Sequence, residues 1–250
     1  MDYLKFYNTQ KEKWGEWWQG DFTSWEEAQK ECIGYDQEYI VQKVFQAVIA
    51  TKDKANYYER DGCIISDFPY YIYNYINYLQ NKRVLDFGGG LGSTYFTIKH
   101  QSTIKEWHVV EQEIYVKYGR LLENDTLYFH NNIEDVNEFD VILFSSSLPY
   151  IKDYDRYIKY AIDKNTPYII FDRHSVIQNS FEDRLTIQIV PECIYPTIYP
   201  CWFFGENKLK NFMNNNDYIL KKEFMSLGDT SATGGYITNS AYKGYVYGYE

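Results

Sequence analysis

An acid and four glycines stand close together in residues 83–94, which read Arg-Val-Leu-Asp-Phe-Gly-Gly-Gly-Leu-Gly-Ser-Thr. The apolar residues predict a short strand, and the glycines predict a tight turn that leads into a helix. Because glycine lacks a Cβ and tolerates positive φ, such a turn lets the backbone approach a ligand closely. Two nucleoside-containing cofactors suit this arrangement, a nicotinamide dinucleotide and S-adenosylmethionine (SAM).

The spacing of the glycines distinguishes the two cofactors. The dinucleotide fingerprint G-x-G-x-x-G requires a further glycine at position 93 or 95, and the chain has Ser93 and Tyr95 there. The SAM-binding pattern D-x-G-x-G-x-G fits without a mismatch and consists of Asp86, Gly88, Gly90 and Gly92. SAM is therefore the predicted cofactor. We expect Asp86 near its ammonium group, and Ser93 and Thr94 as further contacts at the start of the helix.

The ends of the next predicted strands supply the other cofactor contacts. Glu111 ends one strand, where its carboxylate is placed to accept hydrogen bonds from the ribose hydroxyls, with Gln112 beside it. Asn131 and Asn132 follow the third strand, and Asn132 is the candidate for the adenine. Ser145 ends the fourth strand in a run of small residues that would let the reactive methyl group face an acceptor.

The sequence Asp172-Arg173-His174 follows the fifth predicted strand and is the candidate catalytic segment. The pKa of histidine is usually close to neutral pH, which suits His174 as a general base for a hydroxyl acceptor. Asp172 is the neighbouring candidate, as the base or as the group that orients His174. An alternative is that His174 has only a structural role. No histidine pair has the spacing of metal ligands, so no metal site is predicted.

Arginines indicate a different kind of acceptor. Arg173 can hold a phosphate or carboxylate through a bidentate pair of hydrogen bonds, and Arg60 and Arg184 can do the same. An anionic oxygen needs no general base, so such an acceptor would make His174 dispensable. The other interpretation of Arg173 is an internal ion pair with Asp172.

The elements that must position these residues form an α/β pattern. Five short strands alternate with helices, which predicts a Rossmann-like parallel sheet. A C-terminal pair of strands, separated by a connection with Gly228, Gly234 and Gly235, predicts an antiparallel hairpin at the sheet edge. The expected strands are 83–87, 106–111, 126–130, 140–145 and 168–172, followed by 217–226 and 242–249. Five parallel strands and a final hairpin are the arrangement of class I SAM-dependent methyltransferases.

Two further regions complete this organisation. Residues 1–82 are predicted to be a helical extension that forms a lid, and residues 83–250 the SAM-binding domain. Within it, residues 173–205 form an irregular, proline-stiffened insertion that binds the acceptor. Aromatic and polar side chains there and nearby are the predicted acceptor contacts, namely Tyr150, Gln188, Tyr195 and Tyr199. Residues 57–61 are expected to line the same cleft.

Composition excludes several classes of partner. The chain has 250 residues, with 35 acidic and 25 basic side chains and a net charge of −10, which argues against nucleic-acid binding. No apolar run approaches the ~20 residues of a transmembrane helix. The 4 scattered cysteines indicate reduced thiols and a cytoplasmic protein. The 28 tyrosines suit a pocket for a polar ring such as a sugar.

With these residues placed, the chain resembles the LIC12133-type methyltransferase family of bacterial surface-polysaccharide loci. The resemblance spans nearly the whole chain and includes Glu59-Arg60-Asp61, the glycine turn, Asp172-Arg173 and Tyr199-Pro200. It implies SAM as cofactor and a role in capsule or lipopolysaccharide synthesis. His174 departs from the family pattern, so no role is carried over to it.

The resulting hypothesis is a SAM-dependent O-methyltransferase that acts on a hydroxyl of a sugar, as a free or nucleotide-linked small molecule. One alternative acceptor is an anionic oxygen or amine on a surface glycan. A second alternative is a module that binds SAM or S-adenosylhomocysteine without catalysis. A nicotinamide-dependent oxidoreductase is disfavoured by Ser93.

Overall fold

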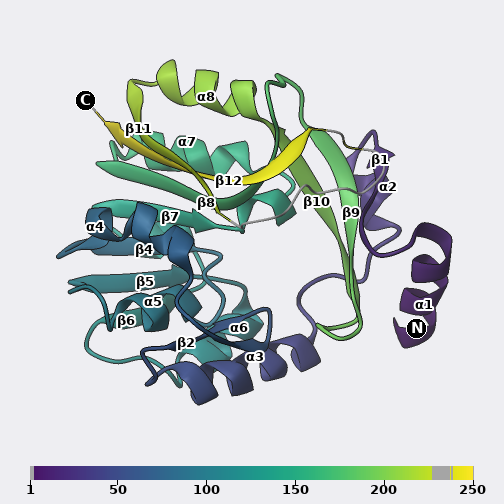
Figure 1. The fold of residues 1–250 in the computed structure, drawn as a ribbon, viewed down its shortest axis with the longest axis horizontal. Helices are drawn as coiled ribbons and strands as arrows, with labels where there is room; N and C mark the ends of the chain where they lie inside the picture. The colour runs from purple at the N-terminus through teal and green to yellow at the C-terminus, as the bar shows by residue number, and fades with distance from the viewer. Residues whose placement is uncertain (1–2, 227–236, 238, 250) are drawn as a thin grey trace.

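A five-stranded parallel sheet forms the centre of the protein, as predicted (Figure 1). The computed structural model describes residues 3–226, 237 and 239–249. The parallel strands lie in the order β6-β5-β4-β7-β8. Their bounds are β4 Arg83–Phe87, β5 Glu106–Val110, β6 Leu127–His130, β7 Val141–Ser145 and β8 Tyr168–Ile177. All five residues of β7 are buried, as expected for a parallel strand with both faces covered.

Helices cover both faces of this sheet. On one face, Val84 and Leu143 share a core with α3, α4, α5 and α6; on the other, Leu85 and Phe144 pack with α7 and α8. The helices are α3 Glu38–Thr51, α4 Ile76–Leu79, α5 Ser93–Ile98, α6 Glu113–Gly119, α7 Asp155–Asp163 and α8 Glu206–Asn214. Because neighbouring strand residues point to opposite faces, each strand contributes to both cores.

The C-terminal hairpin is present at the edge of the parallel strands. β11 (Tyr218–Met225) pairs antiparallel with β12 (Ser240–Tyr249), and β12 pairs antiparallel with β8. The prediction of this hairpin is confirmed. The glycines expected in its connection, Gly228, Gly234 and Gly235, lie outside the described residues.

The predicted irregular insertion is instead a second sheet region, which we call the wing. Strands β9 (Arg184–Val190) and β10 (Thr197–Gly205) pair antiparallel, and β1 (Trp17–Phe22) pairs with β9. β8 continues to Ile177 and meets β10 at Phe204, so the wing extends the central sheet. Figure 1 shows β9 and β10 turning away from the parallel strands.

Alternating apolar residues explain why this segment forms strands despite its prolines. Leu185, Ile187 and Ile189 pack in one core with residues of α1 (Tyr3–Trp14) and α2 (Trp25–Gln29). The described pairing of β10 with β8 involves only Phe204 and Gly205, so Pro200 lies where β10 has one unpaired edge. A proline is tolerated at such an edge because no N–H is required there.

The N-terminal region contains helices, as expected, and also strands. Ser24 caps α2 by accepting from the Glu27 N–H, and α3 follows at Glu38–Thr51. The strands β1, β2 (Tyr57–Arg60) and β3 (Cys63–Ser66) were not predicted. A 3₁₀ helix, Tyr70–Asn74, precedes α4. Movement of this region as a lid stays a prediction. Two further 3₁₀ turns span Ile133–Asp135 and Leu148–Tyr150.

Among the helices that the structure describes, none has the length and apolar character that a membrane crossing requires.

Candidate cofactor and acceptor site

A cavity of about 810 Å³ lies at the carboxyl ends of the parallel strands. Its wall includes the turn after β4, the ends of β5, β6 and β7, the tip of the β2–β3 hairpin and the inner face of the wing. Ligands of open α/β sheets bind at this edge, outside the carboxyl ends of the strands. The cavity is therefore the candidate functional site.

The glycine turn forms one wall of the cavity and needs its glycines. Gly88, Gly90 and Gly92 have φ values of 70°, 58° and 78°, which L side chains rarely adopt. A Cβ on Gly88 would lie 2.4 Å from the Ser147 Cβ, whereas a Cβ on Gly90 would meet nothing within 4 Å. The turn is thus packed at Gly88 against Ser147, two residues after β7, and is open at Gly90.

Glu111 lies beside this opening, at the end of β5. Its Oε1 accepts from the Gly90 N–H at 3.2 Å and its Oε2 from the Gln112 N–H at 2.7 Å. Burial raises the pKa of Glu111 to about 7, although the two backbone N–H groups oppose the shift. The remaining lone pairs can accept hydrogen bonds from vicinal hydroxyls such as those of a ribose.

Most predicted cofactor residues line this cavity together. They are Gly88, Gly90, Ser93, Thr94, Glu111, Gln112, Asn132 and Ser145. Gly92 is not part of the lining and is the N-cap residue of α5. The open glycine turn, with the hydrogen-bonded carboxylate of Glu111 beside it, fits the nucleoside and methionine parts of SAM.

Asp86 does not reach the cavity, contrary to the prediction. Its side chain is fully buried, and its Oδ2 accepts from the Trp107 Nε1 at 3.1 Å. A Cβ on Gly89 would lie 2.4 Å from the same Oδ2, so the carboxylate lies directly beneath the turn. Burial raises the pKa of Asp86 to about 7. Asp86 therefore supports the turn and does not face the ligand space.

His174 is also separated from the cavity. It lies inside β8, is fully buried, and stacks on Phe204 in the wall of a different cavity of about 130 Å³. Its Nδ1 lies 3.0 Å from the Asp172 carbonyl oxygen, and burial lowers its pKa to about 3. The expectation that a strand end at residue 172 exposes His174 fails because β8 continues to Ile177.

Asp172 and Arg173 are neighbours on β8 and form the internal ion pair that the sequence offered as one interpretation, with the Arg173 Nε 3.6 Å from the Asp172 Oδ2. The Asp172 Oδ2 is buried and accepts from the Ser145 Oγ at 3.0 Å and the Tyr75 hydroxyl at 3.2 Å. Burial raises the pKa of Asp172. Arg173 has a φ of 54° and lines the cavity, where its guanidinium donates to the Ser145 Oγ at 3.0 Å and lies over the Tyr71 ring. Arg173 is thus a cationic group at the cavity wall.

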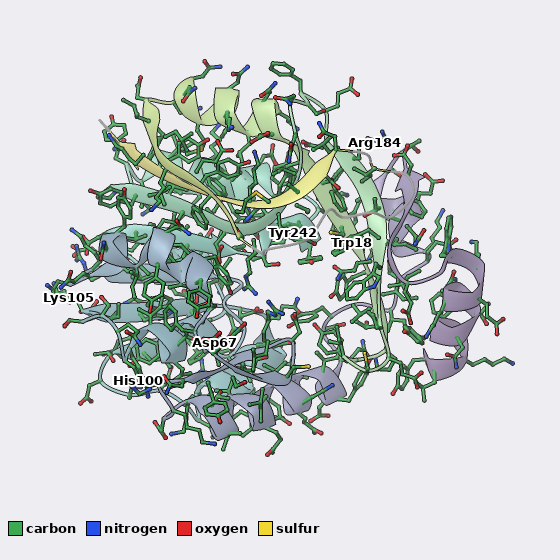
Figure 2. The ribbon with its side chains drawn as sticks, in the orientation of Figure 1. Trp18, Asp67, His100, Lys105, Arg184 and Tyr242 are labelled. Carbon is green, nitrogen blue, oxygen red and sulfur yellow. The ribbon has the colours of Figure 1, made fainter. Side chains whose placement is uncertain are left out.

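Tyrosines form the far part of the cavity, which we call the tyrosine chamber. It consists of Tyr35, Tyr150, Tyr195, Tyr199 and Tyr242. The Tyr150 hydroxyl donates to the Gln188 Oε1 at 2.8 Å, and the Tyr150 and Tyr199 rings meet edge to face at 5.0 Å. Figure 2 shows Tyr242 close to Trp18 of the wing, and their ring centroids are 5.6 Å apart. All four predicted acceptor residues in this region line the chamber or its edge.

The β2–β3 hairpin brings three charged residues into the cavity. Arg60 pairs with Cys63 across Asp61 and Gly62, whose φ values of 53° and 71° are those of a type I′ turn. Asp61 is exposed at the tip, and its Oδ1 lies 3.5 Å from the Tyr195 hydroxyl. Burial, and then the charge of Asp61, raise the pKa of Tyr199 well above its usual value.

Glu59 is the third of these charged residues and is buried beside the glycine turn. Its Oε1 accepts from the Gly62 N–H at 2.7 Å, and its Oε2 accepts from the Ser93 hydroxyl. Burial raises the pKa of Glu59 to about 7. The sequence signal for this hairpin is the Asp-Gly pair between two short runs with strand-forming residues.

Arg184 does not contribute to the cavity. It lies at the start of β9, at the upper end of the wing in Figure 2, where its Nε donates to the Asp21 Oδ1 at 2.8 Å. Within the described ranges, no group of three or more histidine, cysteine or acidic side chains is arranged to hold a metal ion.

Several solved structures have a similar fold. The [4+2]-cyclase SpnF matches with a TM-score of 0.55 and 12% identity, over 84% of this chain and 93% of its own. The N-terminal domain of EvdMO1, solved in the presence of S-adenosylhomocysteine and D-fucose, matches with a TM-score of 0.51 and 13% identity, over 83% and 96%. A structure from Listeria monocytogenes, assigned as a SAM-dependent methyltransferase, matches with a TM-score of 0.50 and 12% identity, over 72% and 99%.

These likenesses establish the fold of class I SAM-dependent methyltransferases. No protein-family model matches the chain, and no curated protein matches it. Because a [4+2]-cyclase has the same fold, the reaction must be argued from the site.

Proposed function

We propose that the protein is a SAM-dependent O-methyltransferase whose acceptor is a hydroxyl group of a sugar. The observation that carries the proposal is the continuity of the cavity, which joins the glycine turn and Glu111 to the tyrosine chamber. One end suits a nucleoside, and the other suits a polar ring that stacks on aromatic faces and hydrogen-bonds to hydroxyls.

The cofactor end would hold SAM through residues of the turn and the strand ends. Glu111 accepts from the ribose hydroxyls, Asn132 contacts the adenine, and the opening at Gly90 leaves room for the ligand. SAM supplies a methyl carbon that is already electrophilic because it is attached to a positively charged sulfur. The protein's own contribution is alignment of donor and acceptor, which can provide several kcal/mol.

The acceptor end is proposed to bind a sugar. Tyr195 and Tyr199 offer ring faces and hydroxyls, and the Gln188 amide adds hydrogen-bonding capacity. The presence of D-fucose in the EvdMO1 structure supports a sugar acceptor in a site of this fold. Arg173 and Arg60 at the cavity wall support a nucleotide-linked sugar, whose phosphates they would hold.

Asp61 is the residue we propose as general base, in place of His174 and Asp172. A sugar hydroxyl must lose its proton as the new bond forms, and Asp61 is an exposed carboxylate beside the tyrosine chamber. Its neighbour Tyr195 can hold the carboxylate in place. We expect Asp61→Asn to lower kcat about 100-fold while the Kd of S-adenosylhomocysteine stays within about 3-fold.

The proposal is tested by incubating the protein with SAM and a panel of nucleotide-linked and free sugars, with detection by mass spectrometry. The expected result is a product heavier by one CH2 group, which Asp61→Asn forms about 100-fold more slowly. Binding of NADH without binding of S-adenosylhomocysteine in calorimetry would overturn the cofactor assignment.

Two other functions have specific support. Arg173 favours an anionic oxygen as the acceptor, and in that case Asp61→Asn would retain activity. The [4+2]-cyclase shows that this fold also occurs in a protein with another activity, which supports the alternative of a module that binds SAM or S-adenosylhomocysteine without methyl transfer. Such a protein would bind S-adenosylhomocysteine but methylate no compound of the panel.

The role in capsule or lipopolysaccharide synthesis is part of the proposal and rests on the sequence resemblance. A cytoplasmic location is likewise proposed. It is supported by the four free cysteines, Cys32, Cys63, Cys193 and Cys201.

A further inference from the structure

The methionine part of SAM carries an ammonium group, and the structure raises the question of which acid faces it. Asp86 is 0% exposed and does not line the cavity, whereas Gly89 does, and a Cβ on Gly89 would lie 2.4 Å from the Asp86 Oδ2. A direct contact from Asp86 would require the turn to open. The counter-charge must therefore come from another carboxylate near the glycines.

Glu59 has the position and chemistry for this contact. Its Oε2 accepts from the hydroxyl of Ser93, the first residue of α5, immediately after the glycine turn. Its side chain lines the cavity although the residue is only 7% exposed. Among the residues that the structure describes, no lysine, arginine or histidine nitrogen forms an ion pair with Glu59.

A buried carboxylate without a cation is costly, because it loses hydration and gains no opposite charge. The neighbouring elements only partly offset this cost. The Gly62 N–H and the Ser93 hydroxyl donate hydrogen bonds, but the two charges that act on the Glu59 pKa oppose each other: Asp61 on the same hairpin raises it and Arg173 of β8 lowers it. A ligand cation at this point would complete the site.

We propose that Glu59 binds the α-ammonium group of SAM, and that Asp86 acts only as a support for the turn. This assignment rests on the proposed use of SAM. Three other carboxylates line the cavity. Glu111 accepts from the Gly90 and Gln112 N–H groups at the proposed ribose position, and Asp61 faces Tyr195 in the acceptor part. Glu134 is exposed in the 3₁₀ turn Ile133–Asp135. The N-terminal hairpin thus becomes part of the cofactor site.

The test compares two ligands by calorimetry, S-adenosylhomocysteine and its deamino analogue, in which hydrogen replaces the α-amino group. We expect Glu59→Gln to weaken S-adenosylhomocysteine about 10- to 50-fold, since a charge-assisted hydrogen bond is lost. The deamino analogue should bind the variant and the wild type within about 3-fold. The wild type should bind the deamino analogue more weakly than S-adenosylhomocysteine, by about the same factor as that by which Glu59→Gln weakens S-adenosylhomocysteine.

Two control variants separate this role from structural effects. Glu182→Gln changes an exposed carboxylate that does not line the cavity and should leave both affinities unchanged. Asp86→Asn should weaken both ligands to the same extent if it acts through the turn. An unfolding transition of Glu59→Gln in urea confirms that the variant is folded.

Equal weakening of both ligands by Glu59→Gln, or no weakening of either, would overturn the assignment. A selective loss of S-adenosylhomocysteine affinity in Asp86→Asn would return the contact to Asp86. If the wild type binds neither ligand, the proposed function itself fails, and this result is distinct from the others.

Discussion

Replacement of Glu59 by glutamine should stabilise the protein without ligand at high pH. Glutamine has nearly the same shape and can keep both hydrogen bonds, because its amide oxygen accepts from the Gly62 N–H and its amide donates to the Ser93 hydroxyl. It removes only the charge. The substitution therefore measures what burial of an unpaired carboxylate costs.

The magnitude follows from the raised pKa of Glu59, about 7 in place of the usual 4.5. Between these two values the folded state holds a proton that the unfolded state has lost, so stability falls as the pH rises through the interval and is constant above it. The full difference corresponds to about 3 kcal/mol of unfolding free energy, as an upper value. We expect Glu59→Gln to exceed the wild type by about 2–3 kcal/mol near pH 8 and by about 1 kcal/mol or less near pH 5.

The assay is urea unfolding followed by circular dichroism at both pH values, with ligand-free protein. Glu134→Gln, at an exposed position, is the control. Its unfolding free energy should differ from that of the wild type by the same small amount at both pH values. A Glu59→Gln protein that is no more stable than the wild type near pH 8 would refute the reasoning. A gain in unfolding free energy that is equal at both pH values would also refute the reasoning.

Three further predictions concern the turn and β8. Gly90→Ala should lower the unfolding free energy by about 1 kcal/mol, because position 90 has a φ of 58°. It should also lower the affinity for S-adenosylhomocysteine about 10-fold or more, because the new Cβ enters the opening. Unchanged affinity in calorimetry would contradict this prediction. Trp107→Phe should lower the unfolding free energy by about 2 kcal/mol because the buried Asp86 Oδ2 loses its hydrogen-bond donor. An unchanged unfolding free energy in urea would show that another donor replaces the indole. His174→Ala should lower stability by about 3 kcal/mol yet keep turnover within about 3-fold. A loss of activity without a loss of stability would restore His174 as a catalytic residue.

The sequence predicted those elements whose local pattern of apolar residues matches their burial in the fold. Strands such as β4 and β7 are short, apolar and followed by glycines or serines, so their positions and the frame of the glycine turn could be derived. Glu111 could be placed because its position at a strand end is fixed by the strand itself.

The remaining parts depend on tertiary contacts that no local pattern contains. β8 was expected to end at residue 172 because polar residues follow, but pairing with β12 and β10 extends it to Ile177 and buries His174. The wing was missed because prolines usually interrupt strands. The glycine-rich motif predicted that Asp86 lies near the ammonium group of SAM. That its side chain is buried follows from the packing of Gly89 and Trp107 around it, which the motif does not contain.

The continuity of β8 has a consequence for redesign of the acceptor. This strand pairs with β7 up to Asp172 and with β10 at Val176 and Ile177, so a single rigid segment sets the position of the tyrosine chamber relative to the cofactor turn. A transplanted wing would thus have to preserve the register of Phe204 with Val176. Substitutions at the inward-facing positions of β9 and β10 offer a safer route to new acceptors, because they leave this alignment intact.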